Sequence, residues 1–382
     1  MDRRSYLLTC GGLALSGCGA PTKRSNILYR SLLEPLDNTK LGYGYDPFLP
    51  GERRHYPMAY GLIASAEANR YHHTGHSNAK KRACAAAEWL YQNRDRDNDG
   101  RIGWGLPFAW DAFGDDSMNP RHHVYTITSA LSGRGLLDVV QFCGLDQQTC
   151  KNYIRTVQAV ADRYIQQSLY NSYNTGICFW YSTAKRDSDV VYNPAAMFAA
   201  LLQRLAAHNS VPESSQEVYD EYANRQMLYI INESEMYNDA VVWRYYGSEK
   251  QQNPNKYNDS VHAAYMVDAL MTYGNYNGKY KNELNQEGMR SGLELFKKNN
   301  ELYRYFDGQS LARIWGLGHL LYVLSRYYPE SNYLEFLIKI TKKYYRNNKY
   351  MPQKNPTHRG FGAVRHTAHI LNGISNAEFS NP

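Results

Sequence analysis

Side chains that could transfer protons or bind a carboxylate recur at the starts of segments with helical spacing. Tyrosine, histidine and aspartate can act as general acids or bases, and arginine binds anions through paired N–H donors. Aspartate also caps helices, so a single one is often structural. Because most of the predicted inner helices begin with such a cluster, we expect one convergent site. Candidate catalytic residues are Asp111, Asp116, His122, His123, Tyr125, Asp189, Tyr192, Asp259 and His262; candidate substrate-binding residues are Trp104, Trp110, Arg313, Trp315, His319, Arg365 and His366.

The longest candidate is the loop from Trp104 to Asp116, directly before one of these clusters. It combines large aromatic rings with three carboxylates. Aromatic faces suit sugar rings, and carboxylates can bond hydroxyls or protonate a leaving oxygen. The competing interpretation is a packed loop whose Trp and Phe side chains plug one end of the fold. The loop therefore predicts contact with a carbohydrate, with packing as the alternative.

The segment Asp95-Arg96-Asp97-Asn98-Asp99-Gly100 matches the first half of a calcium-binding loop. Such loops place oxygen ligands at alternate positions and glycine at the sharp turn. The twelfth position is Leu106, where the motif needs glutamate. The segment therefore predicts either an aspartate-rich turn, which is favoured, or a Ca²⁺ site at Asp95, Asp97 and Asp99 completed by a remote carboxylate. No other cofactor is predicted.

Apolar residues recur at helical spacing along most of the chain after residue 52. The first helix of each pair is rich in small and apolar residues, whereas the second carries many Lys, Arg, Glu and Gln residues. This contrast predicts an all-α toroid with buried first helices inside a ring of half-exposed second helices. The last helix could pair with the amphipathic piece Ile27–Leu36 to complete about six pairs. The predicted helices are 56–73 with 77–93, 123–143 with 146–170, 191–208 with 214–232, 259–275 with 284–298, 310–328 with 331–347, and 363–376.

Tyr71-His72-His73-Thr74-Gly75, followed by an alanine-rich helix, resembles the repeated helix–turn–helix of the six-hairpin glycosidase superfamily. The resemblance covers most of residues 50–378 and implies an (α/α)6-type toroid, complete or incomplete. It also implies a cleft lined by the N-terminal ends of the inner helices. Members of this superfamily and related toroids include glycoside hydrolases, uronyl hydrolases, uronate epimerases and polysaccharide lyases. No catalytic signature of one member aligns here, so the reaction type stays open.

Three functions remain open at this stage. A glycoside hydrolase needs two carboxylates, which Asp111, Asp116, Asp189 and Asp259 could supply. A lyase or epimerase acting on uronates needs Tyr or His for proton transfer and Arg for the substrate carboxylate. The third is a non-catalytic lipoprotein that binds glycans or assists polysaccharide assembly. The formal charge of +7 and the many Tyr, His and Arg residues slightly favour an acidic glycan.

The first residues have the features of an export signal. Arg3 and Arg4 precede a short apolar stretch that ends in Leu15-Ser16-Gly17-Cys18. The tetrad resembles a bacterial lipobox, which implies lipidation of Cys18. Arg-Arg-Ser-Tyr-Leu-Leu also resembles a twin-arginine signal, although Asp2 departs from that motif. We expect a signal peptide at 1–17, a lipidated tether and N-terminal segment at 18–52, and a toroid domain at 53–378.

These features predict a lipoprotein on the periplasmic side of a membrane, and Gly19 after the lipidated cysteine favours the outer membrane. In that compartment disulfides can form, and Cys143 and Cys150 flank a plausible turn for one. The expected partners are a polysaccharide or oligosaccharide, and the membrane through the anchor. The sequence contains no nucleic-acid-binding motif, serine elbow, P-loop, dinucleotide fingerprint or zinc spacing.

Overall fold

The computed structural model describes residues 25–33, 36, 39–46, 48–247, 257–346, 349–350 and 363–379. The predicted signal peptide at 1–17 and the lipidation site at Cys18 lie outside the described residues. Within the described part, no helix combines the length and the apolar character needed to cross a bilayer.

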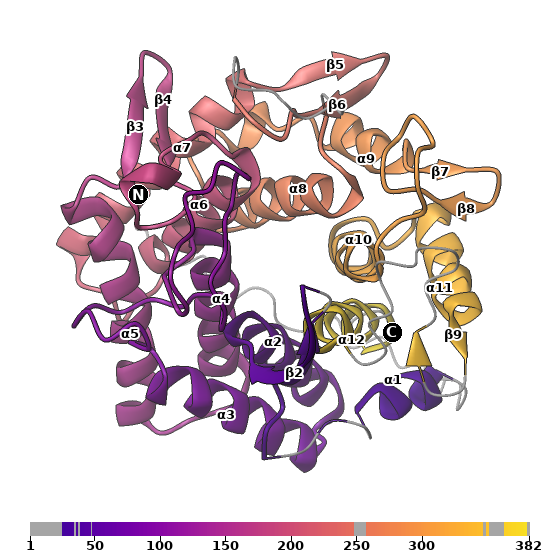
Figure 1. The fold of residues 1–382 in the computed structure, drawn as a ribbon, viewed down its shortest axis with the longest axis horizontal. Coiled ribbons are helices and arrows are strands. Elements are labelled where there is room, and N and C mark those ends of the chain that lie inside the picture. Colours follow the sequence, from indigo (N-terminus) through magenta and orange to yellow (C-terminus); the bar gives the residue numbers. More distant parts are fainter. Residues whose placement is uncertain are drawn as a thin grey trace, which may run out of the picture.

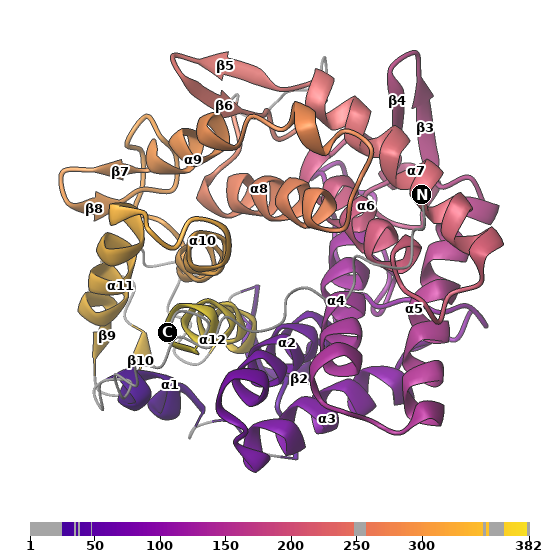
Figure 2. The same cartoon turned by 180° about the vertical axis from the view of Figure 1, so that it is seen from behind.

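Two concentric rings of helices form an (α/α)6 toroid, as Figures 1 and 2 show from opposite sides. The fold class predicted from the sequence is therefore confirmed. The inner helices are α2 (Pro57–Thr74), α4 (Thr126–Phe142), α6 (Tyr192–Ala206), α8 (Ser260–Asn275), α10 (Ile314–Tyr327) and α12 (Val364–Phe379). The outer helices are α1 (Ser25–Leu33), α3 (Ser77–Gln92), α5 (Gln147–Gln166), α7 (Glu213–Asn232), α9 (Gln286–Glu294) and α11 (Asn332–Tyr344).

The inner helices are buried around almost their whole circumference, which explains their small and apolar composition. At the contact of α2 with α4, two glycines bring the helix backbones together. A Cβ atom on Gly135 would lie 2.4 Å from the carbonyl oxygen of Gly61, which is closer than any real contact. The sequence Ser132-Gly133-Arg134-Gly135 thus permits an approach that larger residues would prevent.

Short antiparallel hairpins lead from most outer helices to the next inner helix, and the sequence did not predict them. Strands of two to seven residues carry too few alternating positions to be recognised against helical neighbours. The hairpins are β1–β2 (Tyr43–Asp46, Leu49–His55), β3–β4 (Tyr170–Tyr173, Gly176–Phe179), β5–β6 (Glu235–Tyr237, Ala240–Val242), β7–β8 (Lys297–Lys298, Glu301–Leu302) and β9–β10 (Tyr345–Arg346, Lys349–Tyr350).

The N-terminal helix α1 packs beside α12 and supplies the sixth outer helix. The rings of Tyr29 and Phe379 meet edge to face at 5.4 Å between centroids. The Tyr29 hydroxyl also donates a 2.5 Å hydrogen bond to buried Glu67 on α2. The two ends of the described chain therefore close the ring.

The disulfide between Cys143 and Cys150, which the sequence made plausible, is not formed in this structure. All four cysteines in the described residues have free thiols. Cys143 hydrogen bonds with Cys84 on α3 instead, and the Cys150 thiol faces the backbone oxygen of Leu145 at 3.9 Å. A bridge across the 143–150 turn is therefore absent from this structure.

Candidate active site

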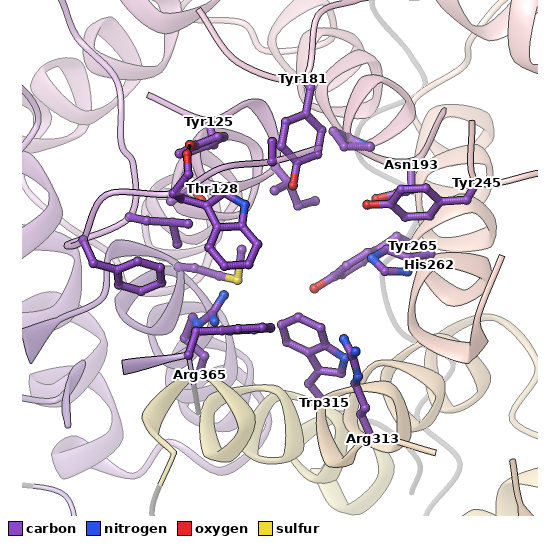
Figure 3. A pocket seen from close by; sticks show the side chains of 18 residues that line it. Tyr125, Thr128, Tyr181, Asn193, Tyr245, His262, Tyr265, Arg313, Trp315 and Arg365 are labelled. Carbon is purple, nitrogen blue, oxygen red and sulfur yellow. Dashed lines mark hydrogen bonds between the residues drawn. The ribbon is translucent and has the colours of Figure 1, made fainter. Parts of the chain in front are cut away.

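A cavity of about 160 Å³ lies where the N-terminal ends of the inner helices converge (Figure 3). Each inner helix contributes a side chain from its start, and the loop before α4 adds aromatic residues. Short apolar side chains and aromatic rings form most of the wall. The polar lining residues are Tyr125, Thr128, Tyr181, Asn193, Tyr245, His262, Tyr265, Arg313 and Arg365.

Two arginines face the cavity on either side of Trp315. The guanidinium carbons of Arg313 and Arg365 lie 5.6 Å and 5.4 Å from the Trp315 ring, within the range of cation–π contacts. Figure 3 shows the indole between the two arginines. This wall of the cavity is therefore both aromatic and cationic.

Arg365 is held by a carboxylate from the other end of the chain. Its Nε and Nη2 atoms donate to the two oxygens of Asp46 at 2.5 Å and 2.9 Å. Burial by itself would raise the pKa of Asp46, but the charge and hydrogen bonds of Arg365 outweigh burial and lower that pKa. Asp46 therefore stays ionised and fixes the guanidinium.

Within the part of the chain that the structure describes, no carboxylate is bonded to Arg313 as Asp46 is to Arg365. Its buried Nε atom has no hydrogen-bond partner among the described residues. Among the described carboxylates, that of Asp259 interacts with the charge of Arg313, but it is already bonded to His262 and Arg304. Because an unpaired buried charge is costly, the position favours a ligand that brings an anionic group.

Half-buried His262 and buried Asp259 form a dyad at the start of α8. Asp259 caps the helix by accepting from the backbone N–H of His262, and its carboxylate lies 2.6 Å from His262 Nδ1. Burial would raise the pKa of Asp259, but His262 and Arg304 outweigh burial and lower that pKa. An ionised carboxylate at Nδ1 orients the ring and leaves Nε2 for proton transfer.

Tyrosines make up much of the remaining polar lining. Tyr125 donates to the backbone oxygen of Trp110 at 3.2 Å, and its side chain also accepts from Asn119. Burial raises the pKa of Tyr181 and that of Tyr245, so both phenols stay protonated near neutral pH. Protonated phenols can donate to sugar hydroxyls or to a developing oxyanion.

Among the described residues that line the cavity there is no Asp or Glu. Asp111 lies instead in an adjoining open groove, where its carboxylate accepts from backbone N–H groups between Phe113 and Asp116 and so shapes its own loop. Asp116 is exposed with a positive φ of 63°, and Asp189 is partly buried away from the lining. The predicted acids therefore do not converge as a pair in this cavity.

The predicted histidines before α4 and the tyrosine of α6 also lie outside the cavity lining. His123 Nε2 lies 2.9 Å from the Ser182 hydroxyl, and His122 adopts a left-handed backbone with φ of 69°. Tyr192 donates a 2.6 Å hydrogen bond to Glu233. These side chains support the loops and helices around the cavity.

Of the remaining predicted binding residues, one lines the cavity and three do not. Trp110 lines the cavity and meets Phe48 edge to face at 5.0 Å. Trp104 is almost fully buried and donates to the backbone oxygen of Leu90, so it packs the loop against α3. His319 is buried 3.0 Å from Asp268, and His366 packs 5.4 Å from the Trp315 ring behind the wall.

Three tyrosines of the cavity lining, and Asp46 behind Arg365, were not identified from the sequence. Tyr181 and Tyr245 follow hairpins in irregular segments, where no periodicity indicates which side chains turn inward. Asp46 belongs to a segment predicted as part of the tether. Tyr265 could have been found, because it lies three residues after His262 and therefore on the same face of α8.

The aspartate loop before α4 brings three carboxylates together. Ligand oxygens of Asp95, Asp97 and Asp99 lie within 4.8 Å of one another. One oxygen of Asp95 and one of Asp97 are buried without a hydrogen-bond partner. Asp99, however, is bound by Arg163 at 2.6 Å, and the position that should supply the bidentate ligand is Leu106, a lining residue of the cavity. The donor set therefore matches calcium only in part.

Comparison with solved structures supports the fold. The Dfg5 protein of Chaetomium thermophilum, solved with glucosamine, matches with a TM-score of 0.59 and 13% identity over 93% of this chain and 89% of its own. A D-mannose isomerase matches with a TM-score of 0.61 and 10% identity over 95% and 99% of the two chains. An inactive α-1,6-mannanase variant of Salegentibacter, solved with α-1,6-mannotriose, matches with a TM-score of 0.60 and 12% identity over 93% and 99%.

At these identities the likeness concerns the fold alone, which is that of the six-hairpin (α/α)6 glycosidase-like proteins. No known family of sequences matches this chain. No curated protein matches it by sequence either. The chemistry of the site must therefore be argued from its own residues.

Proposed function

We propose that this protein is a carbohydrate-active enzyme that moves a proton on an acidic sugar, as a lyase or an epimerase of uronate-containing chains. The observation that carries the proposal is Arg313, a cavity-facing guanidinium with no carboxylate of its own among the described residues, close to the His262–Asp259 dyad. A C–H bond beside a carboxylate loses its proton when the developing negative charge is stabilised. Arginine can stabilise that charge, and histidine can transfer the proton.

The architecture and the aromatic lining support a sugar as the substrate. Trp110 and Trp315 line the cavity, and aromatic rings of this kind suit contact with pyranose rings. Solved proteins of the same fold carry names that refer to sugars, including a mannanase, a D-mannose isomerase and a glucosamine complex. The absence of Asp and Glu from the described cavity lining makes a hydrolase with paired carboxylates the weaker candidate there.

The test is a screen of acidic and neutral polysaccharides with three measurements: absorbance of unsaturated uronates, release of reducing ends, and exchange of the sugar C5 proton in D₂O. We expect one acidic polymer to give unsaturated ends or proton exchange. His262→Gln should lower kcat by about 10²–10⁴-fold. Arg313→Gln should raise KM for the acidic polymer, whereas Arg225→Gln, on the exposed face of α7, should change neither constant. Turnover confined to neutral polymers would contradict the proposal.

A glycoside hydrolase is the second candidate, and one observation favours it. The loop beside the adjoining groove carries Asp115 and Asp116, and a mannanase variant of this fold with two adjacent aspartates replaced by asparagine is described as inactive. In this case Asp116→Asn would abolish release of reducing ends while His262→Gln remained active. Binding without any turnover would instead indicate a glycan-binding or assembly protein.

We also propose that the enzyme is a lipoprotein anchored through Cys18 on the periplasmic side, with the outer membrane favoured. The support is the lipobox-like tetrad that follows a basic and then apolar start. Labelling of growing cells with a radioactive fatty acid should mark the wild-type chain and leave Cys18→Ser unmarked. Membrane fractionation of the same cells would then assign the membrane, and a labelled Cys18→Ser chain would contradict the anchor.

A further inference from the structure

Tyr265 and His369 form a buried hydrogen-bonded pair at the inner wall of the cavity. The Tyr265 hydroxyl lies 2.6 Å from Nε2 of His369, which belongs to α12. The other ring nitrogen, Nδ1, lies 2.6 Å from the backbone oxygen of Arg365. His369 has only about 1% of its surface exposed, whereas Tyr265 lines the cavity.

These contacts determine which atom carries each proton. A backbone oxygen can only accept, so Nδ1 of His369 must donate to Arg365. Burial, together with the charge of nearby His319, lowers the pKa of His369 well below its usual value, so the ring is neutral. A neutral imidazole protonated at Nδ1 has a lone pair at Nε2, and therefore the Tyr265 hydroxyl is the donor.

The single phenolic proton of Tyr265 is thus directed away from the cavity. The side of its oxygen that faces the cavity presents only lone pairs, so Tyr265 accepts there and does not donate. Figure 3 shows the hydroxyl oxygen of Tyr265 directed into the pocket, on the same side as His262. Tyr125, by contrast, donates its proton to the backbone oxygen of Trp110.

His262 and Tyr265 lie on one wall because they are three residues apart on α8. Their ring centroids are 6.3 Å apart. Two-base epimerisation needs proton-transfer groups on opposite faces of a sugar ring, whereas elimination towards one face needs them on the same side. The placement of the two groups on one wall therefore favours elimination.

We propose, building on the function proposed above, that Tyr265 removes the proton from C5 of a uronate while His369 receives the phenolic proton, which makes the enzyme a β-eliminating lyase. The C5–H bond breaks and its electron pair forms the C4–C5 double bond. The C4–O bond breaks, and the leaving oxygen takes a proton from protonated His262. His369 then returns its extra proton through Tyr265 to solvent, and His262 regains one from solvent. Tyr265 is the catalytic base and His369 is a positioning residue.

The decisive variants separate binding from proton transfer. Tyr265→Phe should lower kcat by about 10²–10⁴-fold with KM changed by less than about threefold. His369→Gln keeps an acceptor for the hydroxyl but cannot take up its proton, so activity should fall at neutral pH. It should recover only at alkaline pH, above the pKa of a free phenol of about 10, because burial raises the pKa of Tyr265. The control Tyr219→Phe removes a buried hydroxyl that donates to Asp162 on an outer helix, and kcat should stay within about twofold.

A change in the pH profile of kcat can be assigned to His369 only if the other charged and titratable groups that face the Tyr265–His369 pair are unchanged. On α8 these are His262, Asp259 and Asp268; from the other inner helices they are Arg134, His319, Arg365 and His366. All of these side chains are still present in His369→Gln, so a shift of the pH profile of kcat can be attributed to the loss of the imidazole. An unchanged profile with reduced kcat would overturn the role of His369 as proton acceptor.

A measurement on the resting protein tests the pair without any turnover. In NMR spectra of protein labelled with ¹⁵N at histidine, His369 should be the tautomer protonated at Nδ1, and its Nε2 resonance should shift in Tyr265→Phe. An Nε2-protonated ring would overturn the inference. Full activity of Tyr265→Phe, or C5 exchange without unsaturated ends in the wild type, would also overturn it while leaving the proposed function intact. Turnover of neutral polymers alone would overturn both.

Discussion

His122 and His123, in the loop before α4, are neutral over most of the physiological pH range. Burial and the charges of Arg96 and Arg121 lower the pKa of His122 to about 4. Burial and the charge of Arg163 lower the pKa of His123 to about 4. A histidine that binds its proton only near pH 4 is almost entirely unprotonated at pH 7 and is therefore a poor proton donor there. This agrees with the position of both rings outside the cavity lining.

This shift predicts how stability depends on pH. An unfolded histidine binds its proton near pH 6.5, so between pH 6.5 and 4 the unfolded state holds more protons than the folded state. The stability contributed by neutral His123 is complete above pH 6.5 and is lost as the pH falls towards 4. His123→Gln should remove about 1–2 kcal/mol of this dependence, a value reduced for partial exposure. Urea unfolding at pH 7 and pH 4.5 measures it, and an equal loss in both proteins would contradict the prediction.

Most of the site residues that the sequence predicted lie at or beside the start of a helix, and Trp110 in the loop before α4 is the exception. His262, Arg313, Trp315 and Arg365 were found because helix starts can be located from apolar periodicity, and inner-helix starts converge in a toroid. The aspartates were harder, because a carboxylate that caps a helix or loop has the same sequence neighbours as one that faces a substrate. Asp111 and Asp259 both illustrate this ambiguity.

At the scale of elements, the helices and their alternation of buried and half-exposed members were well predicted, and the short hairpins were not. The positions of the helices follow from composition and spacing, which each segment carries within itself. The hairpins depend on which outer helix must connect to which inner helix, and that is a property of the closed ring. Tyr181 and Tyr245 were missed for this reason.

The close contact of α2 with α4 gives a prediction for two neighbouring glycines. Gly135→Ala should destabilise the protein by about 2–3 kcal/mol, because the new methyl group meets the backbone oxygen of Gly61 and neither helix can move alone. Gly133→Ala on the same helix meets a flexible leucine side chain at 2.9 Å, and the gain in helix propensity should offset much of that cost. Equal thermal unfolding midpoints for both variants would refute this account.

The aspartate loop gives a second prediction at this scale. Burial and the charge of Asp99 raise the pKa of Asp97 to about 6. The folded state therefore holds this proton more tightly than the unfolded state, and the associated stability is lost as the pH rises from about 4 to 6. If the loop is a turn without calcium, Asp97→Asn should stabilise the protein at pH 7 by about 1 kcal/mol. A Ca²⁺-dependent rise in the wild-type melting temperature that Asp97→Asn abolishes would indicate a metal site instead.

For the whole molecule, the ion pair of Asp46 with Arg365 links the segment after α1 to the last helix. Both side chains are buried, with 2% and 5% of their surfaces exposed. Asp46→Asn should cost about 3–5 kcal/mol, because it leaves the guanidinium uncompensated, and should also weaken substrate binding. The exposed pair of Glu221 with Arg225 is the matched control, and Glu221→Gln should cost less than about 0.5 kcal/mol in urea unfolding.

The same pair has a consequence for how the protein is made. Synthesis on the ribosome is vectorial, and Asp46 emerges long before the arginine that neutralises it. A nascent chain that has not yet reached α12 can assemble most neighbouring helix pairs, but it lacks one wall of the cavity and leaves Asp46 without its cation. The cavity is therefore among the last parts of the molecule to be completed, and a product truncated before α12 would lack the wall that carries Arg365.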